Sequence, residues 1–493
     1  MALDADLQAK LEHFLKNCET DEQTLRSTLD TIAKELVSSD ILLYNTIIHY
    51  QYENGIISHY DPKPIPSGYP SGAIELGPFL YFLVNEKPPS SWKTEYQLLW
   101  YAIQAAIIAL VGQSAISPAL YADLLTYIKT TGIPANDGSL IGLDMYQILD
   151  SHWLDAVIYY LYYKAFPKDI APFNSTTTKP ITLSGASPNQ VKIAIIGDWG
   201  TGKYDPTKPY DQQDGSVDGP ALDIMNALPG LAPDYIIHLG DVYYAGTDQY
   251  ALINPNEEQN NLLDVWSSTN TTNFTLNSNH EMYGGANGYF NIALTNNLFA
   301  PQTNHSFFVL EYGNWVIIGL DSAYYCDNDN LYMDGRITDS TQKSLLNQYK
   351  NQTQNVILMS HHNALSYDGA TIETLWNDVL DTDALGSAPA YWYWGHLHDG
   401  IVYSDKTAIG GASCTRCIGH SAIPYGEAWG LLDSQGNNIP TVEYFAHTPV
   451  DPSGKTSARV FNGFAIITLT DTTLTEQFYE LDNTGTAVLK WSS

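Results

Sequence analysis

Basic residues are scarce in this chain of 493 residues. It has 22 Lys and Arg residues against 54 Asp and Glu residues, so its formal net charge is −32 at pH 7. Such a charge repels a phosphate backbone or an anionic membrane surface, which argues against a nucleic-acid-binding or membrane-surface protein. Only 15% of the residues are charged and 44% are hydrophobic. This composition is typical of a folded globular protein and excludes a disordered acidic chain.

Cysteines and long hydrophobic runs are scarce as well. Four cysteines cannot form a disulfide framework, and the pair Cys414 and Cys417 favours a local clip or two free thiols. The longest apolar stretch, 98–112, is interrupted by Gln104 and is shorter than the ~20 residues that cross a bilayer. The N-terminal segment carries charged side chains where an export signal needs an apolar run. We therefore expect neither a signal peptide nor a transmembrane segment, and the chain is either cytoplasmic or exported by another route.

The sequence changes character near residue 180. Residues 1–170 show helical patterns, including an apolar helix over about 143–165, and we expect an all-α N-terminal region. Residues 171–190 are small, polar and Pro-containing, which is typical of a linker. In 191–493, short β-rich runs alternate with helical stretches at 218–228 and 338–350, which predicts a layered α/β domain. The predicted strands are Val191–Ile196, Tyr235–Leu239, Ser306–Leu310, Trp315–Leu320, Asn355–Met359, Ala390–Trp394 and Phe464–Leu469.

Polar side chains follow several of these predicted strands directly. Loops at the carboxyl ends of strands in an α/β sheet meet at one rim, so we expect these side chains to lie close together. Their oxygen and imidazole donors suit two hard or borderline metal ions better than one structural zinc, which prefers a closed Cys/His tetrahedron. The clusters are Asp198-Trp-Gly200, Gly240-Asp241-Val-Tyr-Tyr244, Asn279-His280-Glu281, His361-His362 and Gly395-His396-Leu-His398.

In this order, the motifs DxG, GDxxY, NHE, a His after an apolar strand, and GHxH resemble those of the calcineurin-like metallophosphoesterases. The resemblance is closer to the purple acid phosphatase branch and covers about 191–470. It implies a four-layer β-sandwich flanked by helices. It also implies that Asp241 bridges two metal ions, that Asp198, Tyr244 and His398 complete the first site, and that Asn279, His361 and His396 complete the second.

Two positions depart from the family pattern. Gly200 stands where much of the superfamily has a metal-binding His, and Tyr244 is the expected replacement. Because a phenolate matches the charge of Fe(III), we expect Fe(III) in the first site, with Fe(II), Zn or Mn in the second. Ser278 stands where the family has Gly.

The predicted substrate contacts are residues that can carry positive charge or that adjoin a predicted metal ligand. His280 is the candidate to contact the phosphate or to protonate the leaving oxygen, and Glu281 is expected to orient His280. Only three arginines follow residue 180, and Arg416, with His420 near it, is the candidate for a second phosphate contact. His362 remains open as a ligand, a substrate contact or a spacer.

The resulting hypothesis is a dinuclear-metal hydrolase that cleaves small phosphate monoesters with metal-activated hydroxide. Two alternatives remain open. The same metal ligands would serve a phosphodiesterase or nucleotidase, since they do not determine the leaving group. The helical region 1–170 could also bind a protein partner, which would make the chain chiefly an effector.

Overall fold

The computed structural model of the protein describes residues 132–141, 144–147, 150, 152–205, 219–251, 254–266, 271–405, 413–453 and 457–493. The helices predicted before residue 132 lie outside the described residues. Among the helices searched, none is long and apolar enough to cross a membrane.

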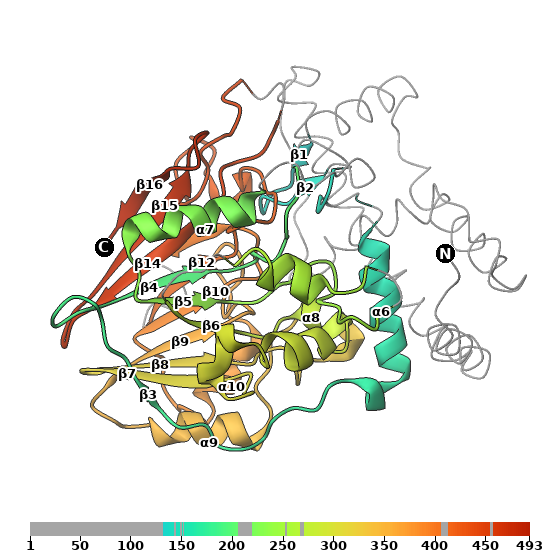
Figure 1. Ribbon diagram of the computed structural model, residues 1–493. Coiled ribbons are helices and arrows are strands. Elements are labelled where there is room, and N and C mark those ends of the chain that lie inside the picture. Colours follow the sequence, from blue (N-terminus) through green and yellow to red (C-terminus); the bar gives the residue numbers. More distant parts are fainter. Residues whose placement is uncertain are drawn as a thin grey trace, which may run out of the picture.

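Two β-sheets form the centre of the described part (Figure 1). The eight-stranded sheet has the order β13-β11-β12-β10-β9-β8-β7-β3 and the six-stranded sheet has the order β16-β15-β14-β4-β5-β6. The first comprises β3 (Ile181–Thr182), β7 (Phe308–Tyr312), β8 (Trp315–Leu320), β9 (Asn355–Ser360), β10 (Tyr391–Trp394), β11 (Gly400–Tyr403), β12 (Cys414–Ile418) and β13 (Val442–Phe445). The second comprises β4 (Val191–Ile196), β5 (Tyr235–His238), β6 (Thr272–Thr275), β14 (Gly463–Leu469), β15 (Leu474–Leu481) and β16 (Ala487–Ser492).

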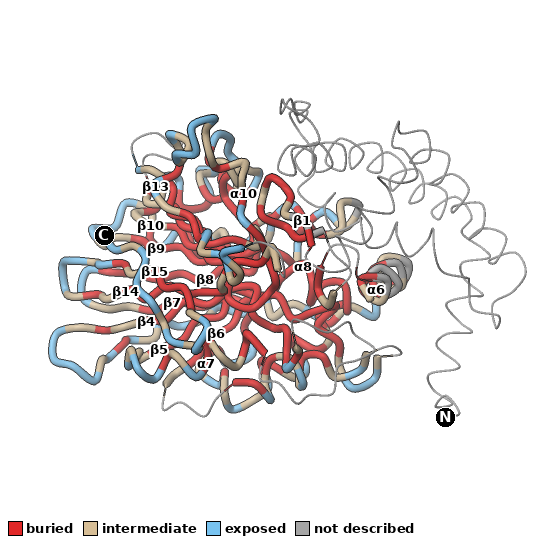
Figure 2. The backbone as a smooth tube through the Cα atoms, turned by 90° about the horizontal axis from the view of Figure 1, so that it is seen from above, coloured by how far each residue is buried: buried red, intermediate tan, exposed pale blue. Residues whose placement is uncertain are grey.

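The central strands β4, β5 and β8 are buried on both faces, and their sequences are accordingly apolar. In β4, Ile193 and Ile195 pack between the two sheets, whereas Ala194 and Ile196 pack on the opposite face. Helix α7 (Pro220–Leu231) packs on that outer face of the six-stranded sheet, and helices α9 (Ser340–Gln348) and α10 (Thr374–Leu380) pack on the outer face of the other sheet. The burial map in Figure 2 follows this arrangement, with the buried chain at the centre and the exposed loops outside. The predicted four-layer α/β fold is confirmed.

The segment before β4 differs from the prediction of helices alone. Strands β1 (Ile133–Pro134) and β2 (Leu140–Ile141) form an antiparallel hairpin. The turn of this hairpin contains Gly138 with a φ of +88°, a conformation that glycine adopts readily. Helix α6 (Trp153–Ala165) begins about ten residues later than expected. Within the predicted linker, β3 pairs in parallel with β7. The domain boundary itself stays a prediction.

Shorter helical segments fill the connections. They are 3-10 helices at Pro167–Asp169, Asn297–Gln302, Asn328–Asn330 and Trp429–Leu431, π-helical turns at Glu258–Leu263 and Tyr289–Ala293, and the short helix α8 at Asn279–Tyr283.

Parallel pairing determines where the polar clusters lie. Strands β4, β5 and β6 run parallel to one another, and so do β8, β9, β10 and β12. The loops after β4, β5 and β6 therefore leave one edge of the six-stranded sheet. Those after β9 and β10 leave the adjacent edge of the eight-stranded sheet, and contacts from Asp198 and Asp241 to His361, His396 and His398 join the two edges.

Candidate metal centre

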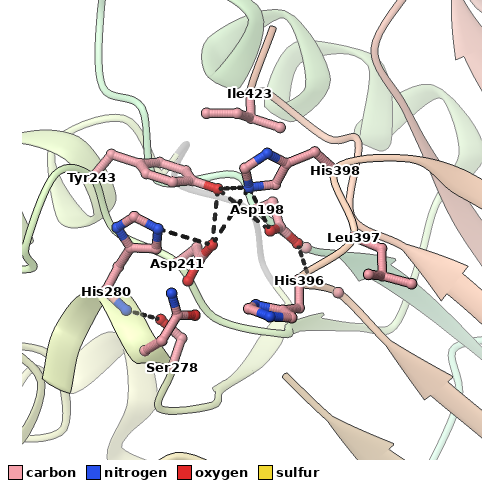
Figure 3. A network of polar contacts seen from close by, with 12 residues as sticks. Asp198, Asp241, Tyr243, Ser278, His280, His396, Leu397, His398 and Ile423 are labelled. Carbon is pink, nitrogen blue, oxygen red and sulfur yellow. Dashed lines mark hydrogen bonds and ion pairs between the residues drawn. The ribbon is translucent and has the colours of Figure 1, made fainter. Parts of the chain in front are cut away.

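A first group of donor atoms surrounds Asp198, Asp241 and His398, whose donor atoms lie within 4.8 Å of one another (Figure 3). His398 Nε2 lies 3.5 Å from Asp198 Oδ1. The phenol of Tyr243 joins them, with its oxygen 3.3 Å from Asp198 Oδ1, 2.9 Å from Asp241 Oδ2 and 3.1 Å from His398 Nε2. The His398 side chain is 17% exposed and the Asp198 side chain is fully buried. The group therefore meets solvent on the side of His398.

A second group of donor atoms surrounds His361. One nitrogen each of His361, His362 and His396 lie within 4.8 Å of one another. His361 Nε2 lies 2.8 Å from Asn279 Oδ1 and 3.2 Å from His396 Nδ1. The Asn279 amide nitrogen donates to the Tyr283 hydroxyl at 3.0 Å. Because the amide nitrogen is turned toward Tyr283, the amide oxygen faces His361.

Asp241 connects the two groups. Its Oδ2 faces Tyr243 and His398, and its Oδ1 lies 3.2 Å from His361 Nε2. Among the described residues, no donor makes a hydrogen bond to Oδ1, although this atom is buried. A buried carboxylate oxygen without a donor is costly unless a cation is present. Asp241 therefore has the arrangement expected of a bridging ligand.

The protonation of His361 gives a second test of whether a cation fits. Its Nδ1 lies 3.0 Å from the carbonyl of Leu239, so this nitrogen carries the hydrogen. Burial, together with the nearby His362 and His396 rings, holds the pKa of His361 well below its usual value, so the ring is neutral. Its Nε2 then presents a lone pair to Asn279 Oδ1 and Asp241 Oδ1, which also present lone pairs. Only a positive charge makes this arrangement favourable, so the donor set fits a metal ion.

The backbone of the two groups is held in uncommon conformations. Asp198, Asp241 and His396 have φ values of 54°, 74° and 66°, in the left-handed region that few non-glycine residues adopt. Residues held in this region cluster at functional sites, where the surrounding structure fixes them. Burial and the charge of Asp241 also raise the pKa of Asp198 well above its usual value. A cation would reverse that effect by favouring the carboxylate.

The tyrosine that reaches the first group is Tyr243, and the prediction of Tyr244 is corrected. The Tyr244 hydroxyl donates to Asp150 Oδ2 instead. Burial and the charge of Asp150 raise the pKa of Tyr244 well above its usual value, which keeps this side chain a neutral phenol. The motif spacing identified the right loop, but two adjacent tyrosines point in different directions, and spacing alone does not decide between them.

His280 faces the first group, and the Tyr244 carbonyl is the hydrogen-bond partner of its ring. His280 Nε2 lies 3.8 Å from Asp241 Oδ2, and Nδ1 lies 2.7 Å from the carbonyl of Tyr244, to which it donates. The Glu281 carboxylate accepts from the Ser278 hydroxyl. Burial and the negative charge of Asp241 raise the pKa of Glu281 to about 8.

Ser278 is accommodated without strain. Its φ is −137°, which any residue adopts, and its hydroxyl accepts from the amide of His280 at 3.1 Å. Serine therefore caps the N-terminus of α8, where an oxygen acceptor is favourable.

Two predicted substrate contacts, Arg416 and His420, are not at this centre. Arg416 lies between the sheets, where its guanidinium pairs with Glu476 through Nε at 2.9 Å and Nη2 at 2.8 Å. His420 is enclosed against Gly400 and Gly463, and burial lowers its pKa to about 3, so it carries no charge for a phosphate. His362 lies beside His361 and His396, and its Nδ1 contacts the Ser322 hydroxyl while its Nε2 contacts the Tyr332 carbonyl.

Cys414 and Cys417 are free thiols. They are three residues apart on β12, so their side chains point to opposite faces of the strand and cannot form a clip.

Comparison with known proteins agrees with this geometry. The family model of the calcineurin-like phosphoesterases matches residues 191–400, which contain both donor groups. Residues 191–400 belong to the calcineurin-like phosphoesterase family. No curated protein matches the chain.

Two solved structures show a weak similarity to this chain. One, described as "GAP50 the anchor in the inner membrane complex of Plasmodium", has a TM-score of 0.40 at 14% identity and covers 62% of this chain and 88% of its own. The other, "Structure of PhoD", has a TM-score of 0.38 at 13% identity and covers 64% of this chain and 70% of its own. The family assignment rests on the match at 191–400 and not on these similarities.

Proposed function

We propose that this phosphoesterase domain holds two metal ions and hydrolyses small phosphate monoesters. The observation that carries the proposal is Asp241, which directs one carboxylate oxygen to each donor group. Asp198, Asp241, Tyr243 and His398 would hold the first ion. Asp241, Asn279, His361 and His396 would hold the second. When bound, two such ions lower the pKa of a water, supply the nucleophile and offset the charge of the phosphoryl group.

The chain would contribute a proton donor, the His280 ring, in a fixed orientation. His280 directs Nε2 to the centre while Nδ1–H is held by the Tyr244 carbonyl. A proton at Nε2 would pass to the leaving oxygen as the ester bond breaks, a role that general acids fill with gains of about 10²–10⁴ in rate. No arginine among the described residues contacts the donor groups, because Arg336, Arg416 and Arg459 bond elsewhere. The metal ions and His280 would therefore supply the positive charge that a phosphate needs.

Tyr243 supports iron as the first metal. A phenolate at this position favours Fe(III), with Fe(II), Zn or Mn in the second site. We expect the purified protein to show a visible tyrosinate-to-iron absorption band that Tyr243→Phe abolishes and Tyr244→Phe retains. The two substitutions remove the same hydroxyl from adjacent residues, so each controls for the other. A colourless protein loaded with zinc alone would contradict the iron assignment, and loss of the band only in Tyr244→Phe would return Tyr244 to the first site.

The substrate class is tested with paired esters. We expect turnover of an aryl phosphate monoester to exceed that of the matching bis-aryl diester, because the dianionic monoester would gain more from two bound cations than the monoanionic diester. A reversed ratio would favour a phosphodiesterase or nucleotidase. Asp241→Asn is expected to abolish both activities, which separates the enzyme from a contaminating phosphatase.

A further inference from the structure

The segment that precedes the family-matched region packs directly on the catalytic loop. The Trp153 ring lies 4.9 Å from Tyr244, 5.9 Å from Tyr243 and 5.5 Å from His280, between ring centroids. The Tyr146 ring lies 4.7 Å from Tyr244, and the Tyr146 hydroxyl donates to the Thr201 carbonyl at 2.9 Å. Trp153 and Tyr146 are buried, so they support the loop from the interior of the protein.

Asp150 is the polar centre of this support. Its Oδ2 accepts from the Tyr244 hydroxyl and from the amide of Tyr146 at 2.9 Å. Its Oδ1 accepts from the amide of His152 at 3.1 Å and lies 2.8 Å from His152 Nδ1. Asp150 is 3% exposed. A buried carboxylate with this many partners is fixed in position, and Tyr244 is fixed with it.

Tyr244 links Asp150 to His280. Its amide donates to Glu257 Oε1 at 2.7 Å, its hydroxyl donates to Asp150, and its carbonyl accepts from His280 Nδ1 at 2.7 Å. A residue held at both its amide and its side chain cannot rotate its carbonyl freely. The position of Asp150 therefore determines where His280 directs Nε2.

We propose that Asp150 is a positioning residue for His280, acting through the hydroxyl and carbonyl of Tyr244, so that the segment around Asp150 completes the catalytic site. This inference rests on the proposed function of His280 as proton donor to the leaving group. Asp150 touches neither donor group, and it lies outside the residues that match the family.

The test separates positioning from general support by its dependence on the leaving group. A proton donated to the leaving oxygen makes the rate less sensitive to leaving-group pKa. We expect Asp150→Asn and Tyr244→Phe to lower kcat about 10-fold or more for poor leaving groups and much less for good ones, across a series of aryl phosphates. In a His280→Ala background, Asp150→Asn should not lower kcat further, because the residue that Asp150 positions is already absent.

Asp155→Asn is the matched control. Asp155 lies in helix α6, five residues after Asp150, and accepts from Asn254 at 2.6 Å. We expect its leaving-group dependence to equal that of the wild type. An Asp150→Asn variant whose kcat falls equally for all esters, or falls equally with and without His280, would overturn the inference in favour of a structural role.

A second measurement does not depend on turnover. In full-length protein with ¹⁵N-labelled histidine and loaded with Zn²⁺, the Nδ1–H signal that disappears in His280→Ala should be slow to exchange with solvent. We expect Asp150→Asn and Tyr244→Phe to speed this exchange at least 10-fold and Asp155→Asn to leave it unchanged. Unchanged exchange in both test variants would overturn the inference. A wild type that hydrolyses no ester would overturn the proposed function alone, since the exchange measurement still decides the role of Asp150.

Discussion

Arg416 illustrates how burial decides the role of a charged residue. Its guanidinium is 3% exposed and makes two hydrogen bonds to Glu476, whose Oε1 also accepts from Tyr393 at 2.7 Å. The network lies between β12 of one sheet and β15 of the other. Arg416 therefore joins the two sheets and is not available to a phosphate.

Replacing Arg416 tests this assignment. Arg416→Met leaves the buried Glu476 carboxylate without its cation, which typically costs about 3–5 kcal/mol. We expect a large fall in the free energy of unfolding in urea, with KM for a phosphate monoester unchanged in the folded enzyme at low temperature. A raised KM with unaltered stability would restore Arg416 as a substrate contact.

At the scale of single residues, motif order predicted the donor set, and local conformation decided the exceptions. Asp198, Asp241, Asn279, His361, His396 and His398 converge as the motifs indicate. The choice between Tyr243 and Tyr244 was not predictable, because it depends on Asp150, far away in the sequence. The environments of Arg416 and His420 were not predictable either, since strand pairing places them in the interior.

The loop after β4 lies unusually close to the loop after β5. Gly200 forms an isolated parallel bridge with Val242, and its amide donates to the Asp241 carbonyl at 3.0 Å. A Cβ at Gly200 would lie 2.6 Å from that carbonyl oxygen and 2.7 Å from the Val242 Cα. This approach explains why no side chain is present where much of the superfamily has histidine.

Gly200→Ala should therefore displace Asp241. Because backbone atoms and not a flexible side chain meet the added methyl group, we expect metal affinity to fall at least 10-fold, measured by competition with a chromophoric chelator. Gly230→Ala is the control, because a Cβ at Gly230, in helix α7, meets no atom within 4 Å. In a helix, this change typically stabilises by about 0.5–1 kcal/mol. Equal metal affinity in both variants would contradict the importance of the close approach.

At the scale of elements, prediction succeeded where a strand is buried on both faces. β4 and β8 have the predicted bounds, because their apolar runs are continuous and end at polar loops. β1, β2 and β3 were missed, since each has two residues and owes its conformation to a partner strand and not to its own pattern. The longer strands β6, β11, β12, β13 and β16 were not predicted either. The strand predicted at Phe464–Leu469 is present as β14, which pairs antiparallel with β15.

For the whole molecule, part of the net charge of −32 comes from carboxylates of the candidate metal centre. Asp198 and Asp241 are both buried there, and their mutual repulsion opposes folding unless cations bind. Metal binding should therefore contribute to the stability of the entire domain as well as to catalysis.

Metal removal tests this coupling. We expect dialysis against a chelator to abolish hydrolysis and to lower Tm, and readdition of metal to restore both. A ligand at 100 times its Kd stabilises the folded state by about 2.7 kcal/mol when it binds that state alone. In His361→Ala, which loses a donor of the second group, the recovery of Tm on readdition should be smaller. Identical Tm values with and without metal would contradict a preformed centre that binds ions only when folded.

The shared carboxylate makes Asp241 differ from the other donors in what a mutation would do. A substitution at Asp198 or His398 alters one group directly, and a substitution at Asn279 or His396 alters the other. A substitution at Asp241 alters both groups at once, because its Oδ1 and Oδ2 face different groups. In the proposed centre, one mutation at another donor would therefore leave one ion site intact, whereas a change at Asp241 would damage both sites in a single step.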